Sequence, residues 1–282
     1  MAEARRIPSR RDQGGVALIT ALLVVALATI AAVSLSATHQ IDLRRAATSQ
    51  AFNQSLHHGA SLEALAAEAG ARLVAEPELA RALIEEGCES PPLSLELDGA
   101  RVEARLADLH CRLNLNNLLD PEDTETAEAF IRLVEGLAGE HPEMGMDPEA
   151  FIEALRQWAD PEAETDWYQR RDPPYLPGGR PLTSASEMLL VRGVDPADYH
   201  ALRPYITVLP ETGTSINTVA VPERLRAAYR LPEPEAMETD AVGIGPYLQL
   251  ATTLERNGTV LRRCTHFHAP GGEVVMRRLH PC

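Results

Sequence analysis

The hydrophobic pattern is strongest near the start of the chain, where residues 16–35 form one uncharged, apolar run. At a rise of about 1.5 Å per residue, a helix of this length spans the roughly 30 Å hydrocarbon core of a bilayer. Apolar residues keep a helical spacing beyond it, and no proline interrupts the pattern before Pro77. One helix is therefore predicted over residues 16–75, with Gly59 and Gly70 as its weak points.

Alternating hydrophobic and polar positions predict strands in two parts of the chain. Residues 92–108 alternate on both sides of Asp98-Gly99, which is a strong hairpin signal. A second turn of this kind, Asn257-Gly258, lies near the end of the sequence, and the strands expected around it are 247–255, 260–268 and 273–280. Together these segments predict one antiparallel sheet, packed against the outer half of the long helix.

Between the two groups of strands the hydrophobic spacing becomes helical, and the acidic residues at several segment starts suit the helix dipole. The expected helices are 126–137, 148–159, 184–190, 196–206 and 222–230. The predicted fold class is α+β: a long N-terminal helix packed on an antiparallel sheet, with a large all-helical insert. The expected boundaries are a leader (1–15), the helix (16–75), a first part of the α/β domain (76–114), the insert (115–230) and the C-terminal strands (231–282).

Charge and motif content narrow the function classes. The 282-residue chain has a formal net charge of -15, so its surface repels phosphate backbones and no nucleic acid is expected as a partner. Residues 189–202 have the pattern of a helix-hairpin-helix, but Asp195 and Asp198 stand where DNA-binding hairpins need amides and basic residues, which favours a protein-contact module. The chain has no G-x-S-x-G, H-E-x-x-H or P-loop motif, and no enzyme activity is expected.

The leader indicates how the chain is oriented. Arg5, Arg6, Arg10 and Arg11 precede the apolar run, and basic residues of this kind stay on the cytoplasmic side. The run is long for a cleaved secretory signal. We therefore expect a single-pass protein of the inner membrane, with a cytoplasmic N-terminus and a periplasmic C-terminal domain.

A short basic leader that ends in glycine, followed by an apolar stretch that opens a long helix, resembles the type IV pilin-like proteins. The resemblance implies that a prepilin peptidase cuts between Gly15 and Val16 and methylates Val16. Most members have a glutamate five residues into the mature chain, where this sequence has Thr20. In that family the carboxylate neutralises the amino terminus of a neighbouring subunit, and an unpaired carboxylate in lipid is costly. A subunit that caps a filament has no subunit above it and would need no such charge.

Three further motifs resemble one branch of that family. They are DLHCRLNLNNLLD at 108–120, WADPEAETDWYQ at 158–169 and SINTVAVPERL at 215–225. With the uncharged position 20, they are similar to the minor pseudopilin K family of the type II secretion system.

This resemblance implies a subunit at the tip of a periplasmic pseudopilus, which initiates filament assembly for export of folded proteins across the outer membrane. The implied partners are the minor pseudopilins I and J, then H and the major pseudopilin G, the prepilin peptidase, the secretin and exoprotein cargo. The alternative is a single-pass, membrane-anchored periplasmic protein with a calcium-binding or uncharacterised enzymatic domain.

Acidic residues are dense in one segment of the insert. The candidate metal ligands are Asp160, Glu162, Glu164, Asp166 and Asp172. Carboxylates this close repel one another unless they are solvated or bind a cation, and oxygen-only ligands in a loop suit Ca²⁺. The resemblance raises the expectation, because family members bind calcium in this insert. The competing interpretation is an acidic, solvated loop.

Cysteines and asparagines supply the remaining candidates. The four cysteines form no C-x-x-C pair, so in an exported domain they predict disulfides rather than zinc. Their positions favour Cys88–Cys111 and Cys264–Cys282 among three possible connectivities. The asparagines at 114, 116 and 117 favour turns and helix caps over subunit contacts.

Overall fold

A computed structural model describes residues 13–76, 78–80, 88–163, 166–233, 244–256 and 258–282. The chain divides into two compact units, residues 1–54 and 55–282. The leader arginines lie outside the described residues. The sheet and the insert both belong to the second unit.

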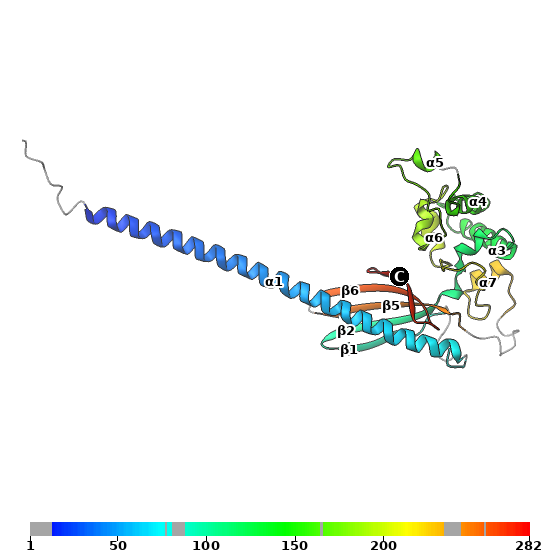
Figure 1. Cartoon of the computed structure of the whole chain (residues 1–282), viewed down its shortest axis with the longest axis horizontal. Coiled ribbons are helices and arrows are strands. Elements are labelled where there is room, and N and C mark those ends of the chain that lie inside the picture. Colours follow the sequence, from blue (N-terminus) through cyan, green and yellow to red (C-terminus); the bar gives the residue numbers. More distant parts are fainter. Residues whose placement is uncertain (1–12, 77, 81–87, 164–165, 234–243, 257) are drawn as a thin grey trace, which may run out of the picture. The chain divides into compact units, whose positions relative to one another are not determined.

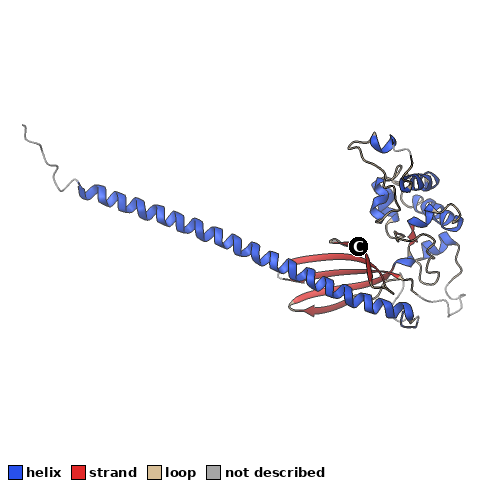
Figure 2. Cartoon of the chain, in the orientation of Figure 1, coloured by secondary structure: helices blue, strands red, loops and turns tan. Residues whose placement is uncertain are grey.

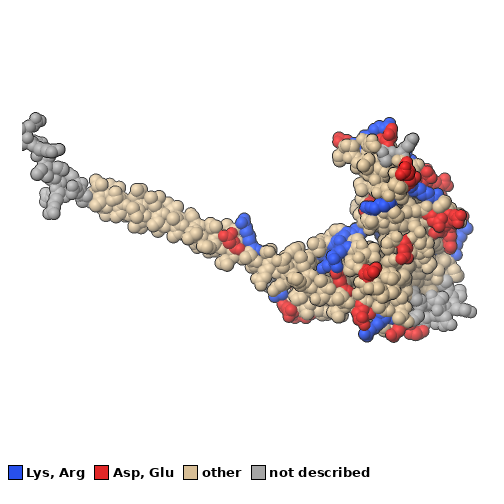
Figure 3. Space-filling view, viewed as in Figure 1, with Lys and Arg blue, Asp and Glu red and all other residues tan. Residues whose placement is uncertain are grey.

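Helix α1 runs without a break from Gln13 to Ala75, as the sequence predicts (Figure 1). It contains an 18-residue window with a mean hydropathy of 2.8, which is long and apolar enough to cross a membrane. Residues 16–50 are exposed along their whole length. No Lys, Arg, Asp or Glu occurs in residues 16–41, and Figure 3 shows this stretch of the helix without charged atoms.

The sheet has five strands in the order β1-β2-β5-β6-β7, with every neighbouring pair antiparallel. Figure 2 shows the strands, in red, alongside the last part of the long helix. The strands are β1 (Leu93–Leu97), β2 (Ala100–Asp108), β5 (Tyr247–Arg256), β6 (Thr259–His268) and β7 (Glu273–Arg278). The predicted strands are confirmed, although β7 ends two residues earlier than expected. One face of the sheet packs against the last part of α1, where Leu73 meets Leu248 and Phe267 in a buried cluster.

Gly59 and Gly70 do not break the helix, and both lie where it comes close to side chains of the sheet. A Cβ atom on Gly70 would lie 2.8 Å from the side chain of Leu248 and 3.0 Å from that of Phe267. A Cβ atom on Gly59 would lie 2.8 Å from the guanidinium of Arg263. The helix tolerates both residues because the closer packing on the sheet offsets their low helix propensity.

The insert is built from short helices around its own core. They are the α-helices α3 (Thr124–Ala138), α4 (Pro148–Ala159), α5 (Asp166–Gln169), α6 (Pro196–Leu202) and α7 (Glu223–Tyr229) and the 3₁₀ helices η2 (Leu115–Leu119) and η3 (Ala185–Leu190). Another 3₁₀ helix, η1 (Leu109–Cys111), follows β2 and precedes the insert. Phe130 of α3 packs on Phe151 of α4 with ring centroids 5.3 Å apart. Asp147 caps α4 by accepting hydrogen bonds from the amides of Glu149 and Ala150.

Two details of the insert differ from the prediction. The segment 184–190 forms a 3₁₀ helix rather than an α-helix. The helix expected over 196–206 ends at Leu202, because Pro204 has no amide hydrogen to continue it. The chain then forms β4 (Ile206–Thr207), which pairs in parallel with β3 (Leu113–Asn114). The regular structure of the insert is therefore mostly helical, but irregular segments join the helices and the insert contains the short strand β4.

Candidate functional site

The membrane segment begins in the first turns of α1, which contain both residues of the expected processing site, Gly15 and Val16. At Thr20 the hydroxyl donates a 3.0 Å hydrogen bond to the carbonyl of Ala17. The polar group at this position is therefore satisfied within its own helix and carries no charge. Thr20 therefore requires no ionic partner inside a membrane.

The first and third sequence motifs meet beside the sheet, around the buried carboxylate of Asp108. Its oxygens accept hydrogen bonds from the amide of His110 at 2.8 Å, the side chain of Asn217 at 2.9 Å and the amide of Gly245 at 3.2 Å. The ring of His110 lies so close to Gly245 that a Cβ atom there would be 1.9 Å from its Cδ2. Gly245 is therefore needed for space, and the motif residues tie the insert to the sheet.

The asparagines of the first motif are buried and bond inward, which confirms the interpretation as turns and caps. Asn114 caps η2 through the amide of Asn116 and also accepts from the amide of Leu209 at 3.0 Å. Asn117 donates to the carbonyl of Thr214 at 2.7 Å and accepts from its amide at 3.2 Å. These side chains replace regular secondary structure in holding the loop around residues 209–214.

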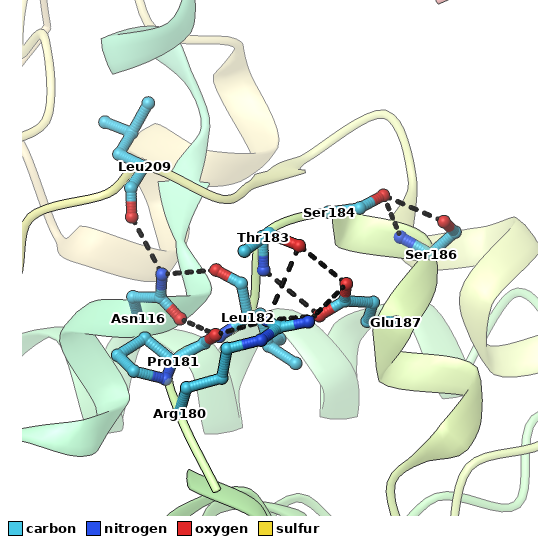
Figure 4. Close-up of polar contacts among 9 residues, drawn as sticks. All are labelled: Asn116, Arg180, Pro181, Leu182, Thr183, Ser184, Ser186, Glu187 and Leu209. Carbon is cyan, nitrogen blue, oxygen red and sulfur yellow. Dashed lines mark hydrogen bonds and ion pairs between the residues drawn. The ribbon is translucent and has the colours of Figure 1, made fainter. Parts of the chain in front are cut away.

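Asn116 fixes the segment that leads into η3 (Figure 4). Its amide group donates to the carbonyls of Leu182 at 2.9 Å and Leu209 at 2.7 Å, and its oxygen accepts from the amide of Leu182 at 3.0 Å. The next residue, Thr183, is held by Glu187. The carboxylate of Glu187 accepts hydrogen bonds from the amide of Thr183 at 3.1 Å and from its hydroxyl at 2.6 Å. Two consecutive residues are thus held from opposite sides.

The hairpin-like segment 189–202 is also bound inward. Asp198 is fully buried, and its carboxylate accepts hydrogen bonds from the amides of Gly145, Met146 and Asp195 at 3.0, 3.1 and 2.8 Å. Gly193 makes the turn with a φ of 88°. Asp198, whose charge argues against DNA binding, therefore stabilises the fold by joining α6 to the segment that leads into α4.

The acidic segment does not form a metal cage among the residues that the structure describes. Asp160 ends α4 and accepts from the amide of Glu162 at 2.9 Å, and Asp166 pairs with Arg170 at 2.6 Å. Glu162 and Asp172 are exposed, and Glu164 lies outside the described residues. No group of three or more His, Cys, Asp or Glu side chains in the described part of the chain is placed to hold a metal ion. The described carboxylates therefore do not fit a preformed calcium site.

The structure joins the cysteines in the two expected pairs. Cys88 and Cys111 have Cα atoms 6.1 Å apart and link the segment before β1 to η1. Cys264 and Cys282 have Cα atoms 5.1 Å apart and link β6 to the segment after β7. Each bond therefore fixes an irregular segment: the first to η1, which follows β2, and the second to β6, an inner strand of the sheet.

Sequence reasoning missed one buried charge cluster. Glu63 of α1 is buried beneath the sheet and pairs with Arg263 and Arg277. The available signal is an acidic residue beside Leu62, in the half of the helix that is expected to pack on the sheet. Alone, that signal does not identify the partners, which lie about 200 residues away: Thr265 is separated from Glu63 by 202 residues and Arg277 by 214.

A long N-terminal helix on an antiparallel sheet, with a large helical insert, defines a pilin-like protein. Residues 111–211 match the model of protein K of the type II secretion system. The chain is 27% identical to the type II secretion system protein K of Aeromonas hydrophila over 270 residues, which cover 89% of this chain and 79% of that protein. It is 30% identical to the Pseudomonas aeruginosa protein of that name over 225 residues, which cover 76% and 67%. The chain belongs to the type II secretion system protein K family.

A solved structure shares the fold. It is a chain of the crystal structure of the GspK-GspI-GspJ complex from the type 2 secretion system of enterotoxigenic Escherichia coli. The TM-score is 0.67 at 19% sequence identity, with 84% of this chain and all of that chain covered. At this low level of identity, the likeness supports the fold alone.

Proposed function

We propose that this protein is a minor pseudopilin at the tip of the type II secretion pseudopilus, where it initiates filament assembly for export of folded proteins. The observation that carries the proposal is Thr20, whose hydroxyl is bonded to its own helix in a chain of the protein K family. A subunit without a carboxylate at this position cannot neutralise the amino terminus of a subunit above it in the filament. The large insert, residues 115–230, supports the same place, because a subunit of this bulk suits the end of a filament.

The mechanism proposed is assembly rather than catalysis. Residues 16–35 hold the subunit in the inner membrane, with the remainder in the periplasm, until the growing filament extracts it. The two disulfides suit an oxidising compartment. No enzymatic activity is part of the proposal.

The nearest proposed partners are the minor pseudopilins I and J. The support is the related crystal structure, which is of a complex of GspK, GspI and GspJ. Contacts with pseudopilin H, the major pseudopilin G, the secretin and exoprotein cargo would follow as the filament grows. The prepilin peptidase would act first, by cutting before Val16 and methylating its amino group.

The protein is expressed together with the native prepilin peptidase and extracted from the membrane. Mass spectrometry then determines its N-terminal residue, which tests the proposal. We expect a chain that begins at N-methylated Val16. Gly15→Leu should retain the leader, whereas Gly14→Ala, which leaves the Gly15–Val16 bond unchanged, should be processed normally. An intact Met1, or a cut near Ser36, would remove the foundation of the proposal.

A second test addresses the partners. The processed chain is co-expressed with pseudopilins I and J of the same secretion system and purified through an affinity tag. We expect all three to elute together in a stable ratio. Elution of the tagged chain alone, although I and J are present in the same membranes, would contradict the tip complex.

We also propose that the acidic segment binds Ca²⁺. The sequence supports this through five carboxylates at 160, 162, 164, 166 and 172. In the described residues Asp166 is paired with Arg170, so binding would require this pair to open. The ion would then act on the conformation of the segment, without a part in any reaction.

A further inference from the structure

The second unit contains a cleft of about 450 Å³ between the sheet face opposite α1 and the insert. Its sheet wall is formed by alternate residues of β2, β5, β6 and β7, which the register places on one face. Its other wall comes from α6, β4 and the segment before η3. The Cys264–Cys282 disulfide lies in the sheet wall and fixes the end of the described chain there.

Positive charge is concentrated in this cleft. The described lining includes four arginines, at 105, 112, 203 and 278, and a single acidic residue, Glu89. This is the opposite of the chain as a whole, whose formal net charge is -15. An excess of arginines in a concave site with low-dielectric walls focuses a positive potential.

Glu89 offsets only one of the four positive charges. Its carboxylate lies 3.7 Å from a guanidinium nitrogen of Arg112 and 3.9 Å from one of Arg105, beyond hydrogen-bond distance in both cases. Among the residues that the structure describes, neither Arg203 nor Arg278 forms an ion pair with an acidic side chain. The guanidinium groups therefore have unused hydrogen-bond donors toward the cleft.

The arginines affect the ionisable groups beside them. Burial, followed by the charges of Arg278 and Arg112, lowers the pKa of His266 to about 3. Burial lowers the pKa of Arg112 as well; Glu89 opposes this shift and Arg203 adds to it. These like charges are held together at an electrostatic cost, and an entering anion would relieve it.

The size and the remaining lining indicate what kind of anion fits. A cleft of about 450 Å³ is many times the roughly 30 Å³ that one water occupies in the liquid, so an inorganic anion would leave it largely unfilled. Apolar side chains such as Ile206, Val208 and Ala251 lie between the arginines. A ligand that carries carboxylates on a partly apolar body matches both features, since arginine recognises carboxylates in a planar, bidentate manner.

We propose that this cleft is a docking site for an acidic peptide segment of a partner protein, whose carboxylates are held by Arg112, Arg203 and Arg278. The inference goes beyond the role at the filament tip and does not depend on it. Peptide binding and N-terminal processing are separate measurements, so the failure of one leaves the other intact.

The test uses the full chain in a mild nonionic detergent and a fluorescein-labelled octapeptide of alternating glutamate and alanine. Fluorescence anisotropy at low salt should show saturable binding that weakens as sodium chloride is added. The matched peptide with glutamine in place of glutamate should not bind. Equal binding of the two peptides would overturn the proposal, because carboxylates would then have no role.

Substitutions locate the site. Arg203→Gln and Arg278→Gln should each weaken binding about tenfold, the loss expected for one charge-assisted hydrogen bond. Arg262→Gln is the matched control, because Arg262 is an exposed arginine of β6 outside the cleft. It removes the same charge and should leave binding unchanged. If all three variants bind alike, the peptide binds elsewhere and the proposal is wrong.

Competition separates an acidic segment from a simple anion. Inorganic phosphate should displace the peptide only at concentrations far above those of an unlabelled copy of the acidic peptide. If phosphate competes as well as that copy, the cleft is a general anion site and the peptide assignment is overturned. Circular dichroism of both cleft variants confirms that they fold, so a loss of binding reports the site itself.

Discussion

Glu63 of α1 and Arg277 of β7 form a two-pronged ion pair: Nη2 lies 2.6 Å from Oε2 and Nε lies 3.0 Å from Oε1. The same carboxylate lies 2.8 Å from Nε of Arg263 and accepts a hydrogen bond from the hydroxyl of Thr265. Burial alone would raise the pKa of Glu63, but the bonds from Arg277 and Thr265 and the charge of Arg263 outweigh it and hold the pKa below its usual value. One carboxylate thus joins the helix to the last two strands.

Removing this carboxylate should be strongly destabilising. Glu63→Ala leaves Arg263, whose side chain is only 6% exposed, as a buried charge without its partner. We expect a loss of about 3 to 5 kcal/mol in the free energy of unfolding, as for other broken buried pairs. The measurement is urea unfolding of the full chain in detergent, with hydrogen exchange of β6 and β7 to localise the effect.

The matched control is Glu68→Ala on the same helix. Glu68 pairs with Arg72 at 3.0 Å, but both side chains are about two-thirds exposed. An exposed pair of this kind contributes about 0.5 kcal/mol or less. Equal losses for the two variants would show that the helix, and not the buried pair, determines the effect.

The Glu63 cluster also shows which parts of the structure the sequence could predict. Helix α1 and the strands follow from patterns that repeat within a few residues, and the turns at Asp98-Gly99 and Asn257-Gly258 place the hairpins. The cluster depends on a partner 214 residues away, and no local pattern carries that information. Only the pairing of β7 beside β6 brings Arg277 to the helix.

The same limit explains one detail of the insert that differed. The strand β4 depends on pairing with β3, which lies about 90 residues earlier in the chain. The end of α6 at Leu202, by contrast, follows from Pro204 close by. The asparagines could be assigned to turns and caps from residue type alone, because short amides commonly bond to the backbone. Which loops they hold could not be predicted, since Leu182, Leu209 and Thr214 come together only in the folded insert.

The contacts of Asn116 give a second prediction. Asn116→Leu keeps a similar volume but leaves the amide and carbonyl of Leu182 without their partner in a buried site. Unsatisfied buried groups cost about 1 to 3 kcal/mol each. We expect a loss of about 2 to 4 kcal/mol and faster proteolysis within residues 180–187.

Tryptophan fluorescence during urea unfolding measures this loss, because Trp158 and Trp167 both lie in the insert. Asn53→Leu is the control, since Asn53 is exposed on α1. If Asn116→Leu unfolds at the same urea concentration as the control, the bonds to Leu182 do not stabilise the insert.

Calcium gives a third prediction. Calcium added to the full chain after treatment with a chelator should raise the melting temperature of the insert, because a ligand that binds only the folded state stabilises it. Asp160→Asn combined with Asp166→Asn should abolish the shift, whereas Asp147→Asn, at a helix cap outside the segment, should retain it. A wild-type chain with the same melting temperature in calcium and in chelator would contradict the calcium proposal.

His266 provides a prediction about pH. Its pKa lies near 3 in the folded protein, chiefly because of burial and then because of Arg278 and Arg112, against an ordinary value of 6.5. The unfolded chain therefore binds a proton at His266 over a range of pH in which the folded chain does not. By linkage, the contribution of His266 to stability is fully present above about pH 6.5 and is lost progressively as the pH falls toward 3.

The carboxylates of the chain titrate in part of the same range, so the test is a difference between two proteins. In His266→Gln the side chain does not titrate and can still donate a hydrogen bond to Gln249, whose Oε1 lies 3.2 Å from His266 Nε2. We expect the free energy of unfolding of the wild type to fall more steeply than that of the variant between pH 6.5 and 4. Parallel curves would mean that the pKa of His266 is the same in the folded and the unfolded protein. Neither burial nor the charges of Arg278 and Arg112 would then act on the ring as described.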